Sequence, residues 1–173
     1  MGWSSDGRGA KGGRGANDGR GAWGVRRGIQ VVEVTSAQGT VVDEALLARA
    51  ETVHRQLRPQ IPTDYVGRIR EIVSKGAEMA VAVVDGEVAG LAVWRVVERT
   101  LSKRELYCDD LVTDERQRST GVGHALMAHM EGVARARGCD LYTLDSGTHR
   151  QQAHKFYFRE GMTITSFHFG RPL

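Results

Sequence analysis

The sequence has few cysteines and no long apolar run, and both shortages exclude classes of protein. Its 173 residues include only Cys108 and Cys139 as cysteines, which stand apart without the spacing of a metal site. Isolated cysteines of this kind indicate reduced thiols in a cytoplasmic protein. No stretch of about 18 apolar residues occurs, so we expect no membrane-spanning helix. The first residues also lack the run of about 7–15 apolar residues that is typical of a signal peptide.

The sequence has no net positive charge outside the first 28 positions. Residues 1–28 carry a formal charge of +4 against +3 for the whole chain, which leaves −1 for the remainder. A nearly neutral remainder lacks the basic surface of a nucleic-acid-binding domain, so nucleic acid is not an expected partner. Residues 1–28 also hold 10 of the 22 glycines and almost no aliphatic side chains. We expect a disordered, dispensable Gly/Arg-rich tail over 1–28 and one folded domain over 29–173.

Hydrophobic periodicity predicts an α/β domain in which helices pack on a sheet. The Asp85-Gly86 pair predicts a hairpin turn, and the polar link over 98–103 predicts a second reversal of the chain. The strands on either side of these turns therefore form an antiparallel meander. The expected strands are 30–35, 79–84, 88–97, 105–113, 140–144 and 162–169, and the expected helices are 42–57, 63–74, 121–137 and 150–160.

The sequence does contain a glycine turn between the strand at 105–113 and the helix that follows it. The turn reads Arg118-Ser119-Thr120-Gly121-Val122-Gly123. A strand that passes through glycines into a helix exposes free backbone N–H groups at the positive helix end, which is typical of a phosphate site. Arg118 adds a forked cationic donor beside them.

Two common nucleotide motifs do not fit this turn. The chain contains no G-x-x-x-x-G-K-[ST] loop. The dinucleotide pattern G-x-G-x-x-G also fails, because Leu126 stands where the third glycine is required.

The turn instead resembles the [QR]-x-x-G-x-[GA] signature of the GNAT N-acetyltransferase superfamily. Downstream, the run from Ala153 to Met162 resembles the A-x-x-F-Y-x-x-x-G-[FM] segment of the same superfamily. Both motifs occur in the expected order, and the resemblance covers about residues 29–173. It implies a mixed, mostly antiparallel sheet that is splayed between its fourth and fifth strands, with helices on both faces. It also implies acetyl-CoA as cosubstrate and no metal.

The resemblance implies a specific set of cofactor contacts. The pantetheine arm is expected in the gap of the splayed sheet, against backbone groups of the fourth strand, and the pyrophosphate on the turn. Arg150 stands where the family often has Asn, so two roles remain open for it, a phosphate contact or a brace for its own helix. The implied cofactor-binding residues are Leu111, Val112, Thr113, Arg118, Ser119, Thr120, Gly121, Val122, Gly123, His124 and Arg150.

Three residues are the implied catalytic candidates. Tyr157 matches the tyrosine of the F-Y motif and is the implied general acid for the leaving thiolate, the alternative being a tyrosine of the core or its rim. Asp109 and Asp110 resemble the Glu-Asp pair of polyamine and glucosamine-phosphate acetyltransferases. By that resemblance Asp109 takes a proton, directly or through water, and Asp110 orients the amine or braces a loop. Neighbouring side chains of a regular strand point to opposite faces, so both acids reach one site only if a bulge interrupts the strand.

The expected activity is direct transfer of acetyl from acetyl-CoA to a primary amine within a ternary complex. The two acids favour a small cationic acceptor, and Tyr65 and the segment Leu57-Arg58-Pro59 are expected to shape its pocket. A peptide or protein amine is the first alternative. A non-catalytic acetyl-CoA-binding module is the second, although it has no need of Tyr157 or the acids. A homodimer also remains open.

Overall fold

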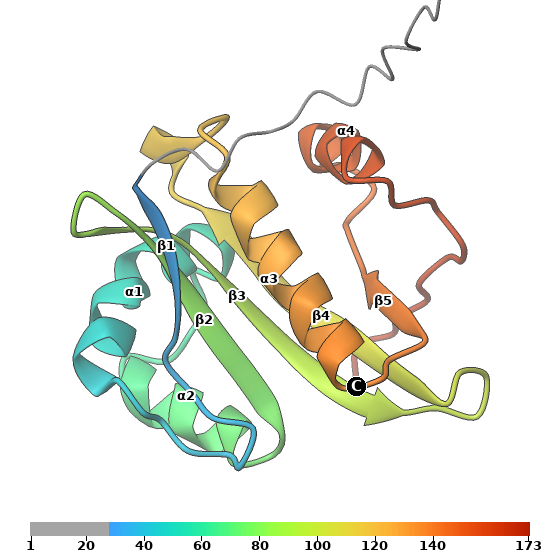
Figure 1. Cartoon of the computed structure of the whole chain (residues 1–173), viewed down its shortest axis with the longest axis horizontal. Helices are drawn as coiled ribbons and strands as arrows, with labels where there is room; N and C mark the ends of the chain where they lie inside the picture. Colours follow the sequence, from blue (N-terminus) through green and yellow to red (C-terminus); the bar gives the residue numbers. More distant parts are fainter. Residues whose placement is uncertain (1–27) are drawn as a thin grey trace, which may run out of the picture.

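The computed structural model describes residues 28–173, so the tail expected over 1–28 lies, except for Gly28, outside the described residues (Figure 1). The chain forms strands and helices in an order close to the expected one. The elements are β1 (Ile29–Glu33), α1 (Glu44–Leu57), α2 (Tyr65–Val73), β2 (Ala77–Val84), β3 (Glu87–Glu98), β4 (Arg104–Thr113), a 3-10 turn η1 (Glu115–Gln117), α3 (Val122–Ala136), β5 (Leu141–Leu144) and α4 (Gln151–Arg159).

The strands form one sheet in the order β1-β2-β3-β4-β5. The first three pairings are antiparallel, and β4 and β5 pair in parallel. The β4–β5 ladder ends at the pair Cys108 and Leu144, whereas β4 continues to Thr113. Among the described residues, no strand therefore pairs with the last half of β4 on its β5 side. This confirms the mixed, mostly antiparallel sheet that is splayed between its fourth and fifth strands.

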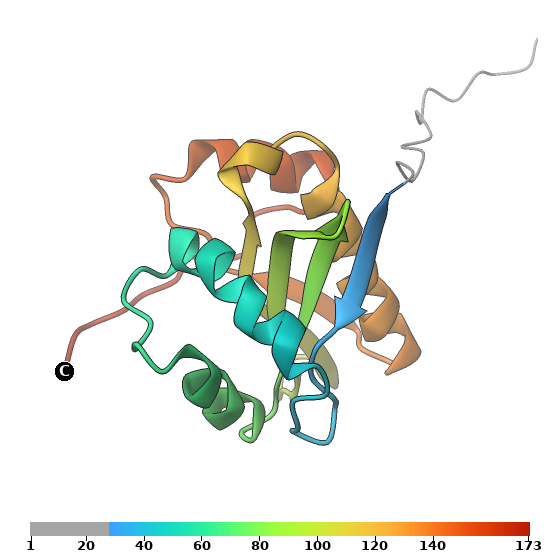
Figure 2. The same ribbon diagram turned by 90° about the vertical axis from the view of Figure 1, so that its left-hand side faces the viewer.

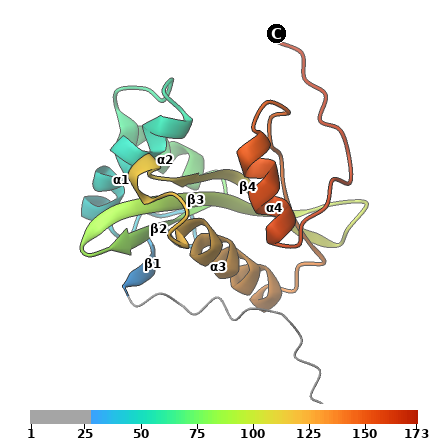
Figure 3. The same ribbon diagram turned by 90° about the horizontal axis from the view of Figure 1, so that it is seen from above.

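The alternation of side chains along β2 explains why helices cover both faces of the sheet. Met79 and Val81 belong to a core cluster with α1 and α2, while Ala80 and Ala82 belong to a second cluster with α3. Figures 2 and 3 show α1 and α2 on one face and α3 on the other. Small alanine side chains on the α3 face let that helix approach the strands closely.

Gly90 fixes the position of the first turn of α3 over β3. A Cβ atom at Gly90 would lie 2.6 Å from Cγ1 of Val122 and 2.8 Å from the backbone oxygen of Val112. Only glycine leaves room for this contact. The helix start is thereby held directly beside the open half of β4.

Two sequence expectations need correction. The strand expected over 162–169 does not form, and residues 163–173 are exposed without regular structure. A strand needs a neighbour for its backbone groups, and β5, at four residues, offers only a short edge to this segment. The helix expected over 63–74 begins at Tyr65 rather than at position 63, because Asp64 is its N-cap and the Asp64 carboxylate accepts from the Gly67 N–H at 2.9 Å. No helix of the described residues is both long and apolar enough to cross a membrane.

Candidate active site

The glycine turn forms an open cradle of backbone N–H groups at the start of α3. Gly121 is the N-cap residue with φ of 99°, and it offers no side chain to cap the helix. The first N–H groups of a helix have no partner within the helix. Ser119 also has a positive φ of 62°, which completes the tight path of the turn. The cradle therefore has the geometry that anions bind at helix N-termini.

The cradle lies in a groove of about 1010 Å³, which we call the turn groove. It extends from the open half of β4, across the start of α3, to α4. Most of the residues that the sequence implied for the cofactor line it. These are Leu111, Val112, Thr113, Arg118, Ser119, Gly121, Gly123, His124 and Arg150, together with Tyr157.

Thr120 and Val122 do not line the turn groove, although both lie in the turn. The Thr120 hydroxyl donates to the backbone oxygen of Gln117 at 2.6 Å. Val122 is only 1% exposed and packs into the α3-side core. Only the backbone of these two residues is therefore suited to contact a ligand.

The charge of the turn groove suits an anionic ligand. Arg118, Arg150 and Arg159 line it. Glu160 also lines the groove, and its carboxylate lies 2.8 Å from Nδ1 of His124. Arg150 is the N-cap residue of α4 but makes no side-chain cap hydrogen bond.

Tyr157 projects from α4 into the same groove. Its ring packs against Phe156 at a centroid distance of 5.5 Å. Burial, with the nearby Cys108 thiol, raises the pKa of Tyr157 to about 12. The phenol therefore keeps its proton at neutral pH and is available as a donor.

A β-bulge at Asp109 interrupts β4. Val93 pairs with Asp110, and the next residue, Trp94, pairs with Cys108, so Asp109 is left over. This is the bulge that both acids need in order to share a face. Asp110 contacts His54 of α1, and Asp109 contacts Arg95, which lies two residues after Val93 on the α1–α2 face of β3.

The two acids have different surroundings. Oδ2 of Asp109 accepts from Nε of Arg95 at 2.6 Å, yet burial outweighs this contact and raises the pKa of Asp109. Burial would also raise the pKa of Asp110. There, hydrogen bonds from His54 and Arg58 outweigh burial and lower the pKa. Asp109 is thus the better proton acceptor, and Asp110 is a fixed negative charge.

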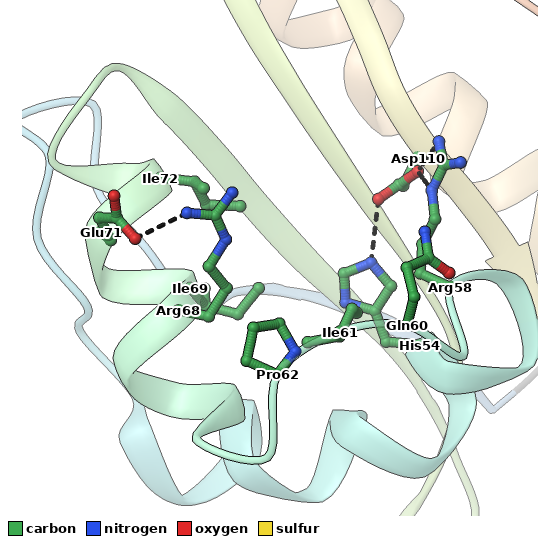
Figure 4. Close-up of a pocket in the computed structure, with 10 residues that line it drawn as sticks. All are labelled: His54, Arg58, Gln60, Ile61, Pro62, Arg68, Ile69, Glu71, Ile72 and Asp110. Atoms are coloured by element: carbon green, nitrogen blue, oxygen red, sulfur yellow. Dashed lines mark hydrogen bonds and ion pairs between the residues drawn. The ribbon is translucent and has the colours of Figure 1, made fainter. Parts of the chain in front are cut away.

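Asp110 lies at the edge of a second cavity of about 420 Å³, which we call the α1–α2 pocket (Figure 4). Of the segment Leu57-Arg58-Pro59, Arg58 lines this pocket, Leu57 lines the turn groove, and Pro59 lines neither. Tyr65 does not line the α1–α2 pocket and reaches Asp110 only through His54, to which its hydroxyl is bonded. The full lining is His54, Arg58, Gln60, Ile61, Pro62, Arg68, Ile69, Glu71, Ile72 and Asp110.

Sequence reasoning missed His54 and Arg95. His54 follows the buried residues Ala50 and Val53 on the inner side of α1, so a polar side chain within an apolar helical stripe was the available signal. Arg95 is a charged residue within the otherwise apolar strand β3. Among residues 28–173, no group of three or more His, Cys, Asp and Glu side chains is placed to hold a metal ion.

Comparison with known proteins identifies relatives of this chain. Residues 45–162 match the model of the acetyltransferase (GNAT) family. The chain is 30% identical over 129 residues to the uncharacterized N-acetyltransferase YhdJ of Bacillus subtilis, a match that spans 73% of this chain and 91% of that protein. A shorter match of 36% identity over 64 residues, 37% of this chain and 42% of the other, is to the aminoalkylphosphonate N-acetyltransferase of Salmonella typhimurium.

Solved structures share the fold. The aminoglycoside N-acetyltransferase AAC(6')-Iy in complex with CoA superimposes with a TM-score of 0.71 at 18% identity, covering 86% of this chain and 98% of that one. An aminoglycoside acetyltransferase from a soil metagenomic sample also gives 0.71, at 15% identity, covering 86% and 99%.

Proposed function

The chain belongs to the GNAT acetyltransferase family and is an acyltransferase, and from this premise we propose that it moves acetyl from acetyl-CoA directly to a primary amine of a small molecule. One observation carries the proposal. Consecutive residues of β4 line the two cavities: Asp110 lines the α1–α2 pocket, and Leu111, Val112 and Thr113 line the turn groove. A donor and an acceptor bound there approach each other over the open half of the strand.

The turn groove supports the donor side of the reaction. The N–H cradle at 121–124 and the guanidinium of Arg118 are suited to the pyrophosphate of acetyl-CoA. The open edge of β4 offers backbone groups to the amides of the pantetheine arm. A backbone N–H of this edge, near Leu111, would polarise the thioester carbonyl as negative charge develops on its oxygen.

The acids and Tyr157 supply the proton transfers. The bound ammonium first loses one proton to water, and the neutral amine attacks the thioester carbon. Asp109 accepts the second amine proton, directly or through one water, as the C–S bond breaks. A phenol with a pKa of about 12 is a weaker acid than a thiol, whose ordinary pKa is about 8.5. Tyr157 therefore stabilises the departing thiolate first by a hydrogen bond. The thiolate then takes the phenol proton as Tyr157 regains one from water, which gives free coenzyme A.

Direct transfer is favoured over an acetyl-cysteine intermediate. Cys108 is 3% exposed, and burial raises the pKa of its thiol, so the nucleophilic thiolate is not formed at neutral pH. Its Sγ donates to the backbone oxygen of Asp110, inside the bulge. The Cys108 thiol is thus occupied by a structural hydrogen bond within β4.

The α1–α2 pocket supports a small acceptor with a cationic amine. Asp110 presents a carboxylate that burial does not neutralise, and it lies beside Asp109 on one face of the sheet. The names of the relatives are consistent with amines of this size, because they include aminoglycoside and aminoalkylphosphonate acetyltransferases.

An amine panel tests the proposal. Purified protein is incubated with acetyl-CoA and, in turn, aminoglycosides, polyamines, aminoalkylphosphonates and a short peptide, and free thiol release is followed. We expect release above the hydrolytic background with at least one small amine, and strong loss in Tyr157→Phe and Asp109→Asn. Binding of acetyl-CoA without release for any amine would contradict the enzyme proposal, and release only with the peptide would replace the small-molecule acceptor.

A further inference from the structure

His54 is a buried polar residue that the reaction proposed above does not use. Its side chain is 2% exposed, within the same helix face as Leu47, Ala50 and Val53. An imidazole in such an apolar setting must find partners for both ring nitrogens or destabilise the fold. Both nitrogens have one: Nδ1 lies 3.1 Å from the Tyr65 hydroxyl, and Nε2 lies 3.0 Å from Oδ2 of Asp110.

The ionised state of Asp110 fixes the direction of its hydrogen bond with His54. The Asp110 carboxylate is ionised at neutral pH and can only accept, so Nε2 of His54 carries a proton. Burial, followed by the charge of Glu51, raises the pKa of Tyr65, so its hydroxyl keeps its proton. His54 therefore donates from Nε2 to Asp110, and its Nδ1 hydrogen-bonds to the protonated Tyr65 hydroxyl.

The two oxygens of Asp110 are held in different ways. Oδ2 is bonded to His54 in the interior, as Figure 4 shows. Oδ1 accepts from Nε of Arg58 at 2.7 Å, and the Arg58 side chain is 44% exposed at the end of α1. A cationic amine entering the α1–α2 pocket can therefore replace Arg58 at Oδ1, but it cannot reach the contact at Oδ2.

We propose that His54 is a positioning residue for the acceptor: held between Tyr65 and Asp110, it fixes the Asp110 carboxylate so that Oδ1 faces the incoming amine. This inference rests on the proposed function, because it assigns the acceptor to the α1–α2 pocket. Tyr65 acts behind His54, by holding the plane of the ring through its hydrogen bond to Nδ1.

Two amide substitutions separate the two hydrogen bonds of His54. The amide nitrogen of Gln reaches the position of Nε2 and can still donate to Asp110, whereas the shorter Asn reaches only the position of Nδ1, beside Tyr65. Each variant keeps one of the two hydrogen bonds of His54 and loses the other. If His54 had only a structural role, both variants would change the KM for the amine alike. We expect His54→Gln to stay within about 3-fold of the wild-type KM for the amine, and His54→Asn to raise that KM about 10-fold or more, as expected for loss of one hydrogen bond to a charged group.

The KM for acetyl-CoA is the internal control, since the turn groove does not include His54. It should not change in either variant, and the two melting temperatures should agree closely. Equal amine KM values for the Gln and Asn variants of an active enzyme would overturn the inference alone. If none of the tested amines gave thiol release with the wild-type protein, the result would instead contradict the proposed function, and with it the acceptor role of His54.

Nitrogen-15 NMR of labelled histidine provides a readout that needs no turnover. The wild-type spectrum should contain the signal of an imidazole with a proton on Nε2 that disappears in His54→Gln. Its Nε2 signal should shift when a saturating amine substrate displaces Arg58. A His54 signal with the proton on Nδ1 alone would contradict the proposed direction of the hydrogen bonds.

Discussion

Asp109 and Asp110 are neighbours in the chain, yet the fold moves their pKa values in opposite directions. Asp109 gains one partner, Arg95, which does not offset burial, whereas Asp110 gains both His54 and Arg58. Environments that push the pKa values of paired carboxyl groups apart are a common basis for dividing catalytic roles. The sequence predicted an acidic pair and the need for a bulge, but it could not predict which acid gains more partners, because those partners come from α1 and β3.

The amide variant of Asp109 should separate activity from stability. The folded-state pKa of Asp109 is raised, so its ionised form is disfavoured in the folded protein and its charge lowers stability at neutral pH. Asp109→Asn removes that charge and still accepts a hydrogen bond from Arg95. We expect kcat to fall about 10²-fold or more, with an unchanged or higher melting temperature.

Thiol release and differential scanning calorimetry of the same Asp109→Asn preparation measure both effects. Asp110→Asn is the matched control. The folded-state pKa of Asp110 is lowered, so its charge stabilises the fold above the ordinary Asp range, and its amide variant should melt below wild type at pH 7. An Asp109→Asn protein that keeps full kcat, or melts well below the Asp110→Asn protein, would refute this division of roles.

At the scale of elements, the turn between β4 and α3 depends on a carboxylate that is not in the groove. Asp114 is 1% exposed, caps η1 and pairs with Arg116 at 2.6 Å. Its backbone N–H donates to Ala89 of β3, which ties the turn to the sheet. The sequence indicated a loop here, but not this anchoring, because η1 has only three residues and no apolar periodicity.

Removing the Asp114 charge should destabilise the turn in a pH-dependent way. Hydrogen bonds from Arg116 lower the pKa of Asp114 to about 2, below the unfolded value of about 3.9. The stabilisation is therefore complete above about pH 4 and is lost as the pH falls toward 2. Because Arg116 is exposed, solvent screens the pair, and we expect Asp114→Asn to cost about 1–2 kcal/mol at pH 7.

Urea unfolding at a series of pH values tests the Asp114 prediction. The difference in unfolding free energy between wild type and Asp114→Asn should be constant from about pH 7 to 5 and shrink toward pH 2. A difference that grows on acidification has the wrong sign for a lowered pKa. The KM for acetyl-CoA should rise in the variant at neutral pH, because the cradle follows this turn directly.

At the scale of the molecule, local patterns predicted most of the elements, and tertiary contacts decided the rest. Period-two and helical patterns placed β2, β3, β4 and α3 within a few residues, and the glycine turn predicted the groove. His54 was missed because its partner Asp110 lies 56 positions away and only the packing of α1 on β4 joins them. The strand expected at 162–169 has a strand-like composition, but composition does not supply an edge to pair with.

The described residues alone should suffice for folding and turnover. Within the described residues, both hydrophobic clusters, the turn groove and the α1–α2 pocket are built from residues after Gly28. We therefore propose that residues 29–173 are the catalytic domain, and that a chain beginning at Gly28 keeps the kcat and both KM values of the full chain. Its melting temperature should change by less than about 2–4 °C, the shift that about 1 kcal/mol produces at this size. A larger fall would assign residues 1–27 a stabilising contact with the domain, whereas a rise in the amine KM alone would assign them to acceptor binding.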